Sequence, residues 1–251
     1  MVRLGLIVGT GAADAPGDAL TLDTPRGAVE VRYHHDVARN IERFVVSRHA
    51  RPRRPSHRVN HAANVLALQA CRLDAVFALH TVGAIDSTLS PGTLVVPHDL
   101  LDLNAPAAHA SLFDDEVVHV DFTQPFCPHA RAALVAAGAR DGGTYAMTRG
   151  PRLESAAEIR ALAVLGATLV GQTAGPEATL AREAGLHYAS LCLVVNAAAG
   201  TSPAPLAARD LRSVAASAHD DASAIITKAA ALLPHDMTCA CAEAATRGRL
   251  A

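Results

Sequence analysis

An uncharged amide, Asn196, stands where an apolar run typical of a buried strand gives way to small residues, in Leu-Cys-Leu-Val-Val-Asn-Ala-Ala-Ala-Gly at 191–200. Strand ends in α/β proteins open onto the crevice that binds small molecules, and an amide there can donate and accept in one plane. That chemistry suits a heterocycle with adjacent donor and acceptor atoms. An Asn can also end a strand by hydrogen bonding its own backbone, so this segment alone leaves both interpretations open.

The sequence Gly-Thr-Gly at 9–11 directly follows the predicted strand 4–8. Glycines at such a place let backbone N–H groups approach an anion. A dinucleotide-binding loop fits less well, because the third glycine is missing and Ala-Asp-Ala-Pro at 13–16 does not open a helix. A plain turn remains the alternative to an anion contact.

Other predicted strands also end in groups that could bind phosphate. Arg48, after the strand 43–47, supplies a planar fork for phosphate oxygens and His49 a further donor, although a solvated basic loop has the same composition. Independent turns would rarely place such groups at the same end of successive strands. We therefore expect one phosphate to be held by Thr10, Arg48, His49, Thr81 and Thr173.

Apolar runs and helical periodicity predict the elements that position these groups. Continuous apolar runs are typical of strands covered on both faces, so the sheet should be interior and mixed or mainly parallel. The alternation of strands and helices predicts an α/β fold, a single domain over 1–251 with a central mixed β-sheet flanked by helices, and a loose C-terminal tail at 235–251. The predicted strands are 4–8, 29–33, 43–47, 75–79, 93–97, 143–146, 169–171 and 189–195, and the predicted helices are 62–71, 128–137, 155–165, 176–184 and 206–233.

The composition narrows the class of protein. The 251 residues, half of them hydrophobic, can bury a substantial core, and a formal net charge of −2 gives no electrostatic footprint for nucleic acid or an anionic membrane. The first apolar run is too short for a signal peptide and no uninterrupted apolar stretch reaches about 18 residues, so we expect a cytoplasmic protein. With 3% aromatic residues, few rings are available to a planar ligand, and a partner subunit could supply more.

The five cysteines divide into two groups. Cys71, Cys127 and Cys192 lie in apolar surroundings that suit reduced, buried thiols. Cys239 and Cys241 form a C-x-C sequence near the C-terminus, which could be a redox pair or half of a metal site. Because the sequence shows no second His/Cys cluster at metal-ligand spacing, an incidental feature of the tail is favoured and no metal site is predicted.

Several ordered blocks resemble the methylthioadenosine phosphorylases and trimeric purine nucleoside phosphorylases over nearly the whole chain. The resemblance implies a homotrimer of α/β subunits that cleaves a purine nucleoside with inorganic phosphate as co-substrate. The products would be a free purine and ribose 1-phosphate or its 5-methylthio analogue, and no metal or organic cofactor is implied. The blocks are Gly-Thr-Gly at 9–11, Ser-Arg-His at 47–49, Pro-Ser-His-Arg-Val-Asn at 55–60, Gln-Pro-Phe-Cys-Pro at 124–128, Gly-Pro-Arg-Leu-Glu at 150–154, Pro-Glu at 176–177 and Leu-Ala-Arg-Glu-Ala-Gly at 180–185.

The same resemblance implies roles for individual residues. The five phosphate candidates keep that role, and His119 matches a residue that family members lend to the neighbouring subunit's active site. Relatives usually place Met where this chain has Gln172, and small residues where it has Thr81 and Val82. The implied substrate contacts are Gln172 to the ribose and Asn196, with Ala197 and Ala198, to the base.

The residue at 196 indicates which purine is accepted. Adenine-specific relatives carry Asp at this position, whereas the Asn196 amide can donate to O6 and N7 of a 6-oxopurine; the segment 194–200 is most like that of methylthioinosine phosphorylases. A neutral amide facing the wrong exocyclic group would leave a buried polar atom unpaired, which discriminates strongly. Residues 201–209 contain no His and look apolar, which favours a methylthio group at the 5 position.

The favoured hypothesis is phosphorolysis of S-methyl-5'-thioinosine to hypoxanthine and 5-methylthioribose 1-phosphate. An alternative is a 6-oxopurine nucleoside phosphorylase that takes inosine and guanosine. A hydrolytic nucleosidase would need a carboxylate base, for which Glu154 or Glu177 are the candidates. A nucleoside-binding protein without turnover is the alternative from another class, and phosphate dependence separates these possibilities.

Overall fold

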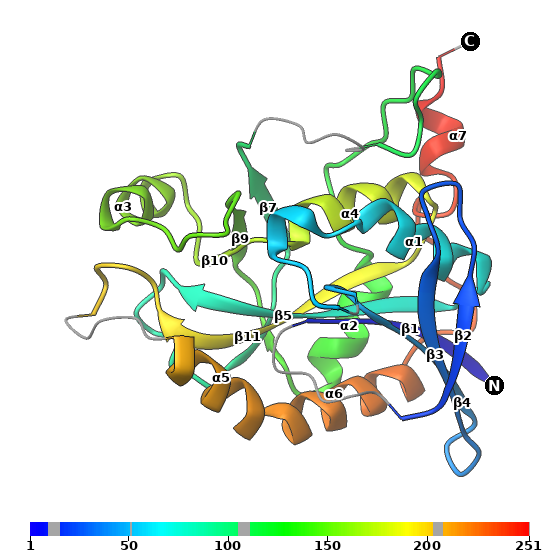
Figure 1. Cartoon of the computed structure of the whole chain (residues 1–251), viewed down its shortest axis with the longest axis horizontal. Helices are drawn as coiled ribbons and strands as arrows, with labels where there is room; N and C mark the ends of the chain where they lie inside the picture. Colours follow the sequence, from blue (N-terminus) through cyan, green and yellow to red (C-terminus); the bar gives the residue numbers. More distant parts are fainter. Residues whose placement is uncertain (10–15, 51, 105–110, 203–207, 251) are drawn as a thin grey trace.

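The structure is a computed structural model that describes residues 1–9, 16–50, 52–104, 111–202 and 208–250 (Figure 1). One mixed sheet runs through the middle of the molecule and helices cover both of its faces. This arrangement confirms the predicted α/β fold with a central mixed sheet.

The sheet is built around β5 (Ala75–Ala84), which pairs in parallel with β1 (Val2–Val8) and β11 (Tyr188–Ala197). One path of neighbouring strands runs β2-β3-β4-β1-β5-β10-β9-β7, while β11 pairs with β5 and β6, and β6 with β8. The remaining strands are β2 (Asp18–Leu22), β3 (Val29–Asp36), β4 (Ile41–Ser47), β6 (Leu94–Val96), β7 (Asp99–Asp102), β8 (Arg140–Asp141), β9 (Thr144–Met147) and β10 (Leu169–Gly171).

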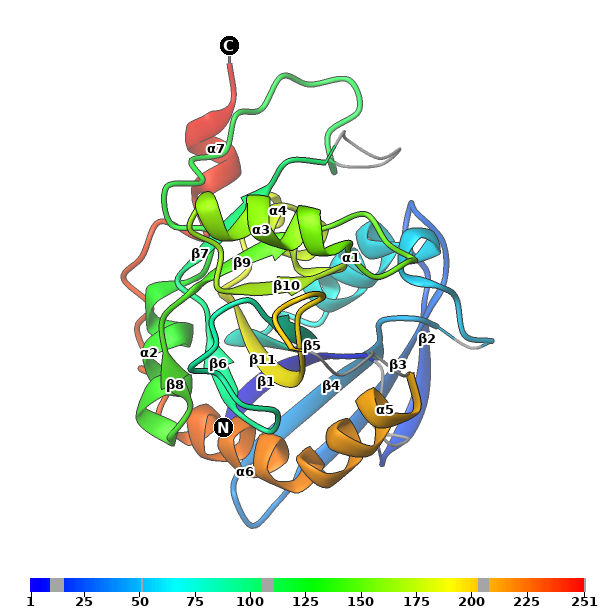
Figure 2. The ribbon, with the colours of Figure 1, turned by 90° about the vertical axis from the view of Figure 1, so that its left-hand side faces the viewer.

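Alternate side chains of the central strands are buried against different helices. Leu4 and Phe77 belong to the core beneath α2 (Pro128–Ala137) and α6 (His219–Ala231), whereas Ile7 and Val76 belong to the core beneath α1 (His61–Ala70) and α4 (Ala174–Glu183). Figure 2 shows α1 and α4 on one side of the sheet and α5 (Ala208–Ser217) with α6 on the other. Burial on both faces explains why these strands are continuous apolar runs.

The remaining helices are short or lie at the periphery. A 3-10 turn, η1 (Ser56–Arg58), precedes α1, and α3 (Ala156–Val164) begins with a capping box formed by Ser155 and Glu158. The last helix, α7 (Ala244–Gly248), lies beside the loop that contains His119 (Figure 1). None of the described helices has both the length and the apolar character needed to span a bilayer.

The structure differs from the sequence predictions in the extent of two elements and in the presence of three additional strands. The predicted helix 206–233 is divided at Ala218 into α5 and α6, and Asp220 with Asp221 in the first turn of α6 favours a new helix start. The strand predicted at 75–79 continues to Ala84, so Thr81 lies within a strand. The strands β2, β7 and β8 were not predicted, because their exposed or very short sequences carry little apolar signal.

The C-terminal segment contacts the rest of the molecule at a few points. Cys241 is 1% exposed, Val118 pairs with Arg249 through an isolated bridge, and the His119 N–H donates to the Gly248 carbonyl at 2.8 Å. From the sequence we expected 235–251 to form a loose tail. Its order in the structure comes instead from backbone pairing and buried cysteine.

Candidate functional site

A cavity of about 470 Å³ opens beside the ends of β4, β5, β10 and β11, a volume within the range of small-molecule sites. Its lining includes six of the predicted site residues, from segments far apart in the chain. The predicted residues that line it are Arg48, His49, Thr81, Gln172, Thr173 and Asn196.

The antiparallel pairing of β10 explains part of this convergence. We expected all the strands to present the same end, but β10 runs antiparallel to β5, with Val170 opposite Gly83. The chain leaving β10 therefore turns back alongside β5, which places Gln172 and Thr173 on the cavity with Thr81.

A β-bulge directs Asn196 towards the cavity. Val194 pairs with Val82 and Asn196 with Gly83, so Val195 is the extra residue, and both Val195 and Asn196 line the cavity. The Asn196 Nδ2 donates to the Ala197 carbonyl at 2.6 Å. The side chain therefore also hydrogen bonds the local backbone, which was the alternative interpretation of this residue from the sequence. An amide has two N–H donors and a carbonyl acceptor, so a donor and the acceptor remain for a ligand.

The Arg48 side chain contributes to the cavity lining, and its guanidinium is held by a buried carboxylate. Arg48 is 2% and Glu177 0% exposed, with Nε donating to Glu177 Oε1 at 2.5 Å and Nη2 to Oε2 at 3.0 Å. Nη1 donates to the Leu79 carbonyl at 2.9 Å. A Cβ on Gly9 would lie 2.3 Å from Nη1, so glycine at this position lets the chain pass the guanidinium. Sequence reasoning did not find this pair, since its members are 129 positions apart.

The buried pair connects to the cavity through His80. The His80 Nδ1 lies 3.0 Å from the Thr173 hydroxyl and Nε2 lies 3.1 Å from the Tyr188 hydroxyl, which donates to Glu177 Oε2 at 3.2 Å. Burial, together with the Arg48 charge, lowers the pKa of His80 to about 3, so its ring is neutral at neutral pH. Although burial opposes ionisation of Arg48 and Glu177, each holds the other charged, which raises the pKa of Arg48 and lowers that of Glu177.

His49 has a fixed orientation at the cavity wall. Its Nδ1 lies 2.8 Å from the Arg54 carbonyl oxygen, an acceptor, so Nδ1 carries the proton. Burial and the nearby Arg48 charge lower the pKa of His49, and Nε2 of the neutral ring can accept. A protonated phosphate oxygen could therefore donate a hydrogen bond to Nε2 of His49.

Gln172 joins two loops at the cavity. Its Oε1 accepts from the Ser56 hydroxyl at 2.8 Å, and its Nε2 donates to the Arg152 carbonyl at 2.9 Å. The oxygen and the nitrogen of the amide therefore both have protein partners. The family resemblance, which implied a contact from Gln172 to the ribose, did not indicate these hydrogen bonds. A thioether at this position could make neither hydrogen bond.

Comparison with known proteins identifies the family. Residues 3–231 match the phosphorylase superfamily. The chain belongs to this superfamily. It is 41% identical to a probable S-methyl-5'-thioinosine phosphorylase of Methanothermobacter thermautotrophicus, over 76% of this chain and 68% of that protein. It is 34% identical to the 6-oxopurine nucleoside phosphorylase of Pyrococcus furiosus, over 97% and 98%.

Solved structures share the fold of this superfamily member. A methylthioadenosine phosphorylase from an antarctic soil metagenomic library superimposes with a TM-score of 0.88 at 24% identity, over 98% of this chain and 92% of that chain. The Schistosoma mansoni methylthioadenosine phosphorylase in complex with adenine gives 0.85 at 23% identity, over 92% and 91%.

The other predicted residues of this phosphorylase superfamily member lie in different places. Thr10 falls outside the described residues, and Ala197 and Ala198 follow Asn196 but do not line the cavity, whereas Ala199 does. His119 is exposed and away from the cavity lining.

The two carboxylates considered for a hydrolase differ in position. Glu154 lines the cavity and accepts from the Thr148 hydroxyl at 2.5 Å. Glu177 is fully buried behind Arg48 and does not line the cavity. Its role is therefore to balance buried charge.

The neutral state of His80 makes stability depend on pH. Between about pH 6.5 and about 3, the unfolded chain protonates this histidine and the folded chain does not, so acid lowers the free energy of unfolding. We expect His80→Asn to reduce this slope by up to about 1.4 kcal/mol per pH unit. Denaturant unfolding at several pH values measures the slope of the free energy of unfolding against pH. His35→Asn, at an exposed histidine, is the matched control variant. A slope equal to that of the unmodified chain would contradict the assignment.

Proposed function

We propose that the protein cleaves the N-glycosidic bond of a 6-oxopurine nucleoside with inorganic phosphate, with S-methyl-5'-thioinosine as substrate. The products are hypoxanthine and 5-methylthioribose 1-phosphate, which makes it a pentosyltransferase of the purine nucleoside phosphorylase type. The observation that carries this proposal is the placement of Asn196 on the same cavity as Arg48, His49 and Thr173. In this arrangement Asn196 would contact the base of a bound nucleoside, and the other three residues would contact the phosphate.

The amide at 196 supports a 6-oxopurine. With one N–H engaged by the Ala197 carbonyl, the other can donate to O6 or N7 of the base. The Methanothermobacter relative, and another from Thermodesulfovibrio yellowstonii that is 31% identical over 97% of this chain, are named as probable S-methyl-5'-thioinosine phosphorylases. These names support the methylthio substrate.

Charge placement accounts for the reaction. As the bond between the sugar C1' and the purine nitrogen breaks, positive charge develops on the sugar, and a phosphate bound beside it stabilises that charge and supplies the oxygen that bonds to C1'. The electron pair of the broken bond passes to the purine. Asn196 would hydrogen bond this base more strongly as its negative charge grows, a contact worth about 10²-fold or more in rate. No side-chain nucleophile is required.

A second candidate function is phosphorolysis of inosine and guanosine. The Pyrococcus furiosus relative, named as a 6-oxopurine nucleoside phosphorylase, covers 97% of this chain. The sequence argument for a methylthio group rests on 201–209, of which residues 203–207 lie outside the described structure. The group at the 5 position therefore distinguishes the two candidates.

The proposal includes a cytoplasmic homotrimer in which His119 reaches the site of a neighbouring subunit. His119 is exposed and is held by backbone pairing beside α7, away from its own chain's cavity. Both features are consistent with a contact made to another subunit.

Purine release tests the proposed reaction directly. We expect hypoxanthine from methylthioinosine only when phosphate is present, at a higher kcat/KM than purine release from inosine, methylthioadenosine or adenosine. The assay is chromatography of the products with and without phosphate. Release without phosphate would indicate a nucleosidase, and binding without release in any mixture would indicate a binding protein.

Asn196→Asp tests the base assignment. A carboxylate can accept from a 6-amino group and cannot donate to O6 unless protonated, so the ratio of methylthioadenosine to methylthioinosine kcat/KM should rise by about tenfold or more. Asn40→Asp makes the same change on an exposed turn away from the cavity and should leave the ratio unchanged. An unchanged ratio in Asn196→Asp would refute the assignment.

A further inference from the structure

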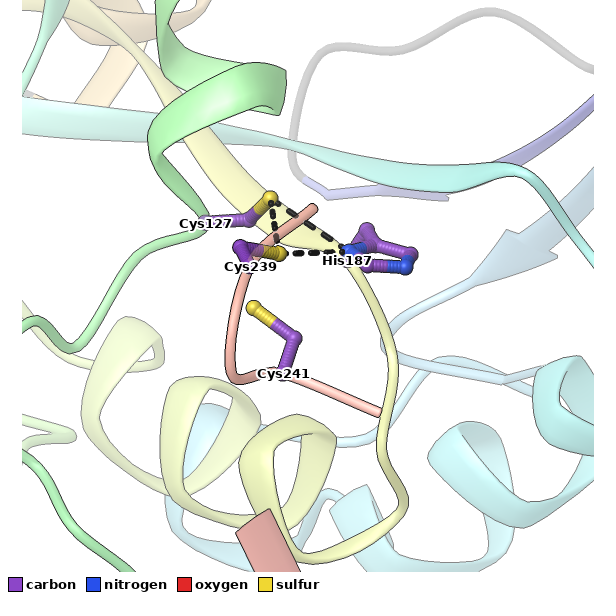
Figure 3. A group of neighbouring side chains, drawn as sticks. All are labelled: Cys127, His187, Cys239 and Cys241. Carbon is purple, nitrogen blue, oxygen red and sulfur yellow. Dashed lines mark hydrogen bonds between the residues drawn. The ribbon is translucent and has the colours of Figure 1, made fainter. Parts of the chain in front are cut away.

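Four potential metal ligands converge at a place separate from the substrate cavity. Cys127 is the N-cap residue of α2, His187 immediately precedes β11, and Cys239 and Cys241 lie between α6 and α7. Figure 3 shows their side chains turned towards one another, and the four possible ligand atoms all lie within 4.8 Å of one another. The C-x-C sequence therefore does meet a third cysteine, Cys127, and a histidine, His187, which come from distant parts of the chain.

The distances in this cluster resemble those of a tetrahedral zinc site. A Zn–S bond of about 2.3 Å and a Zn–N bond of about 2.0–2.1 Å at tetrahedral angles separate two sulfurs by about 3.8 Å, and a sulfur from a nitrogen by about 3.5 Å. Here the Cys127 and Cys239 sulfurs are 3.7 Å apart, and the His187 Nδ1 lies 3.5 Å from Cys127 and 3.2 Å from Cys239. All five cysteines are free, and a disulfide needs a separation of about 2.05 Å.

A buried guanidinium lies beside the cluster. Arg182 is 6% exposed, and its Nη1 donates to the Cys241 sulfur at 3.4 Å while Nη2 donates to the Gln124 carbonyl. Zn²⁺ with three thiolates and a neutral imidazole carries a net charge of −1, so Arg182 would balance it. Side chains that hydrogen bond to metal ligands in this way hold those ligands in place.

We propose that Cys127, His187, Cys239 and Cys241 bind one Zn²⁺ through three thiolate sulfurs and the His187 Nδ1. Because all four positions are filled by protein, the site is structural and not catalytic. Three Zn–S bonds and one Zn–N bond form, and each thiol that is protonated beforehand releases its proton to solvent. The proposal does not depend on the nucleoside reaction.

The ion would link the C-terminal segment that contains Cys239 and Cys241 to the start of β11. Cys239 and Cys241 precede α7, whose last residue Gly248 accepts from the backbone N–H of His119. Zn²⁺ would thus join this segment to the start of α2 and of β11. The loop with His119 would be positioned indirectly, through its pairing with the fastened segment.

Metal binding by the reduced full-length chain tests the proposal. We expect the demetallated protein to take up one Zn²⁺ per chain, measured by competition with a chromophoric chelator and by elemental analysis. Co²⁺ in place of Zn²⁺ should give the thiolate charge-transfer and tetrahedral d–d bands of a Cys₃His site, without any substitution in the chain. Bound metal should also raise Tm.

Cys239→Ser and Cys71→Ser form a matched pair. Cys239 is half-buried within the cluster, whereas Cys71 is a buried thiol elsewhere that contacts the Ala67 carbonyl. We expect Cys239→Ser to bind Zn²⁺ at least about tenfold more weakly and to lose the tetrahedral Co²⁺ spectrum, and Cys71→Ser to bind as the unmodified chain does. Absence of Zn²⁺ uptake and of thiolate–Co²⁺ bands in the unmodified chain, with all five thiols reduced, would overturn the proposal.

Discussion

The buried ion pair of Arg48 and Glu177 is the interaction on which the site depends. Removing two charges from water is costly, and the pair is favourable only because its hydrogen-bonding groups are satisfied, by Leu79, His80 and Tyr188 among others. It fixes the end of β4 against α4 and places Gly9 and Thr173 around a held cation. Truncating Arg48 would leave the Glu177 charge unpaired, at a cost of about 3–5 kcal/mol, so that residue cannot be tested for phosphate binding alone.

At the cavity, a backbone irregularity positions Asn196, the residue that we propose as the contact to the base. The bulge at Val195 places two successive residues on the cavity, and Gly83 leaves room beside Asn196, where a Cβ would lie 3.2 Å from its amide nitrogen. Gln172 then joins the loops on the two sides. Pairing with β5 thus brings Thr173, which follows β10, and Asn196, which lies on β11, to one cavity.

Much of this could be predicted from local sequence. Burial on both faces of β1, β5 and β11 leaves continuous apolar runs, and strand ends marked by Arg48, Thr173 and Asn196 do meet. Contacts across the chain could not be predicted: the partner of Arg48 lies on α4, β10 reverses direction, and Cys127 meets Cys239 112 positions later. A one-residue bulge and the division of the last long helix at Ala218 leave no periodic signal either.

The phosphate dependence of Thr173→Val tests most directly that the buried network presents an anion site to the cavity. Losing a hydroxyl that donates to a charged oxygen costs about 1.5–3 kcal/mol, so KM for phosphate should rise by about tenfold or more while KM for the nucleoside changes little. Thr179→Val removes a similar hydroxyl from α4, where it donates to the Gly175 carbonyl away from the cavity, and should leave both constants unchanged. An unaltered phosphate KM in Thr173→Val would contradict this account of the site.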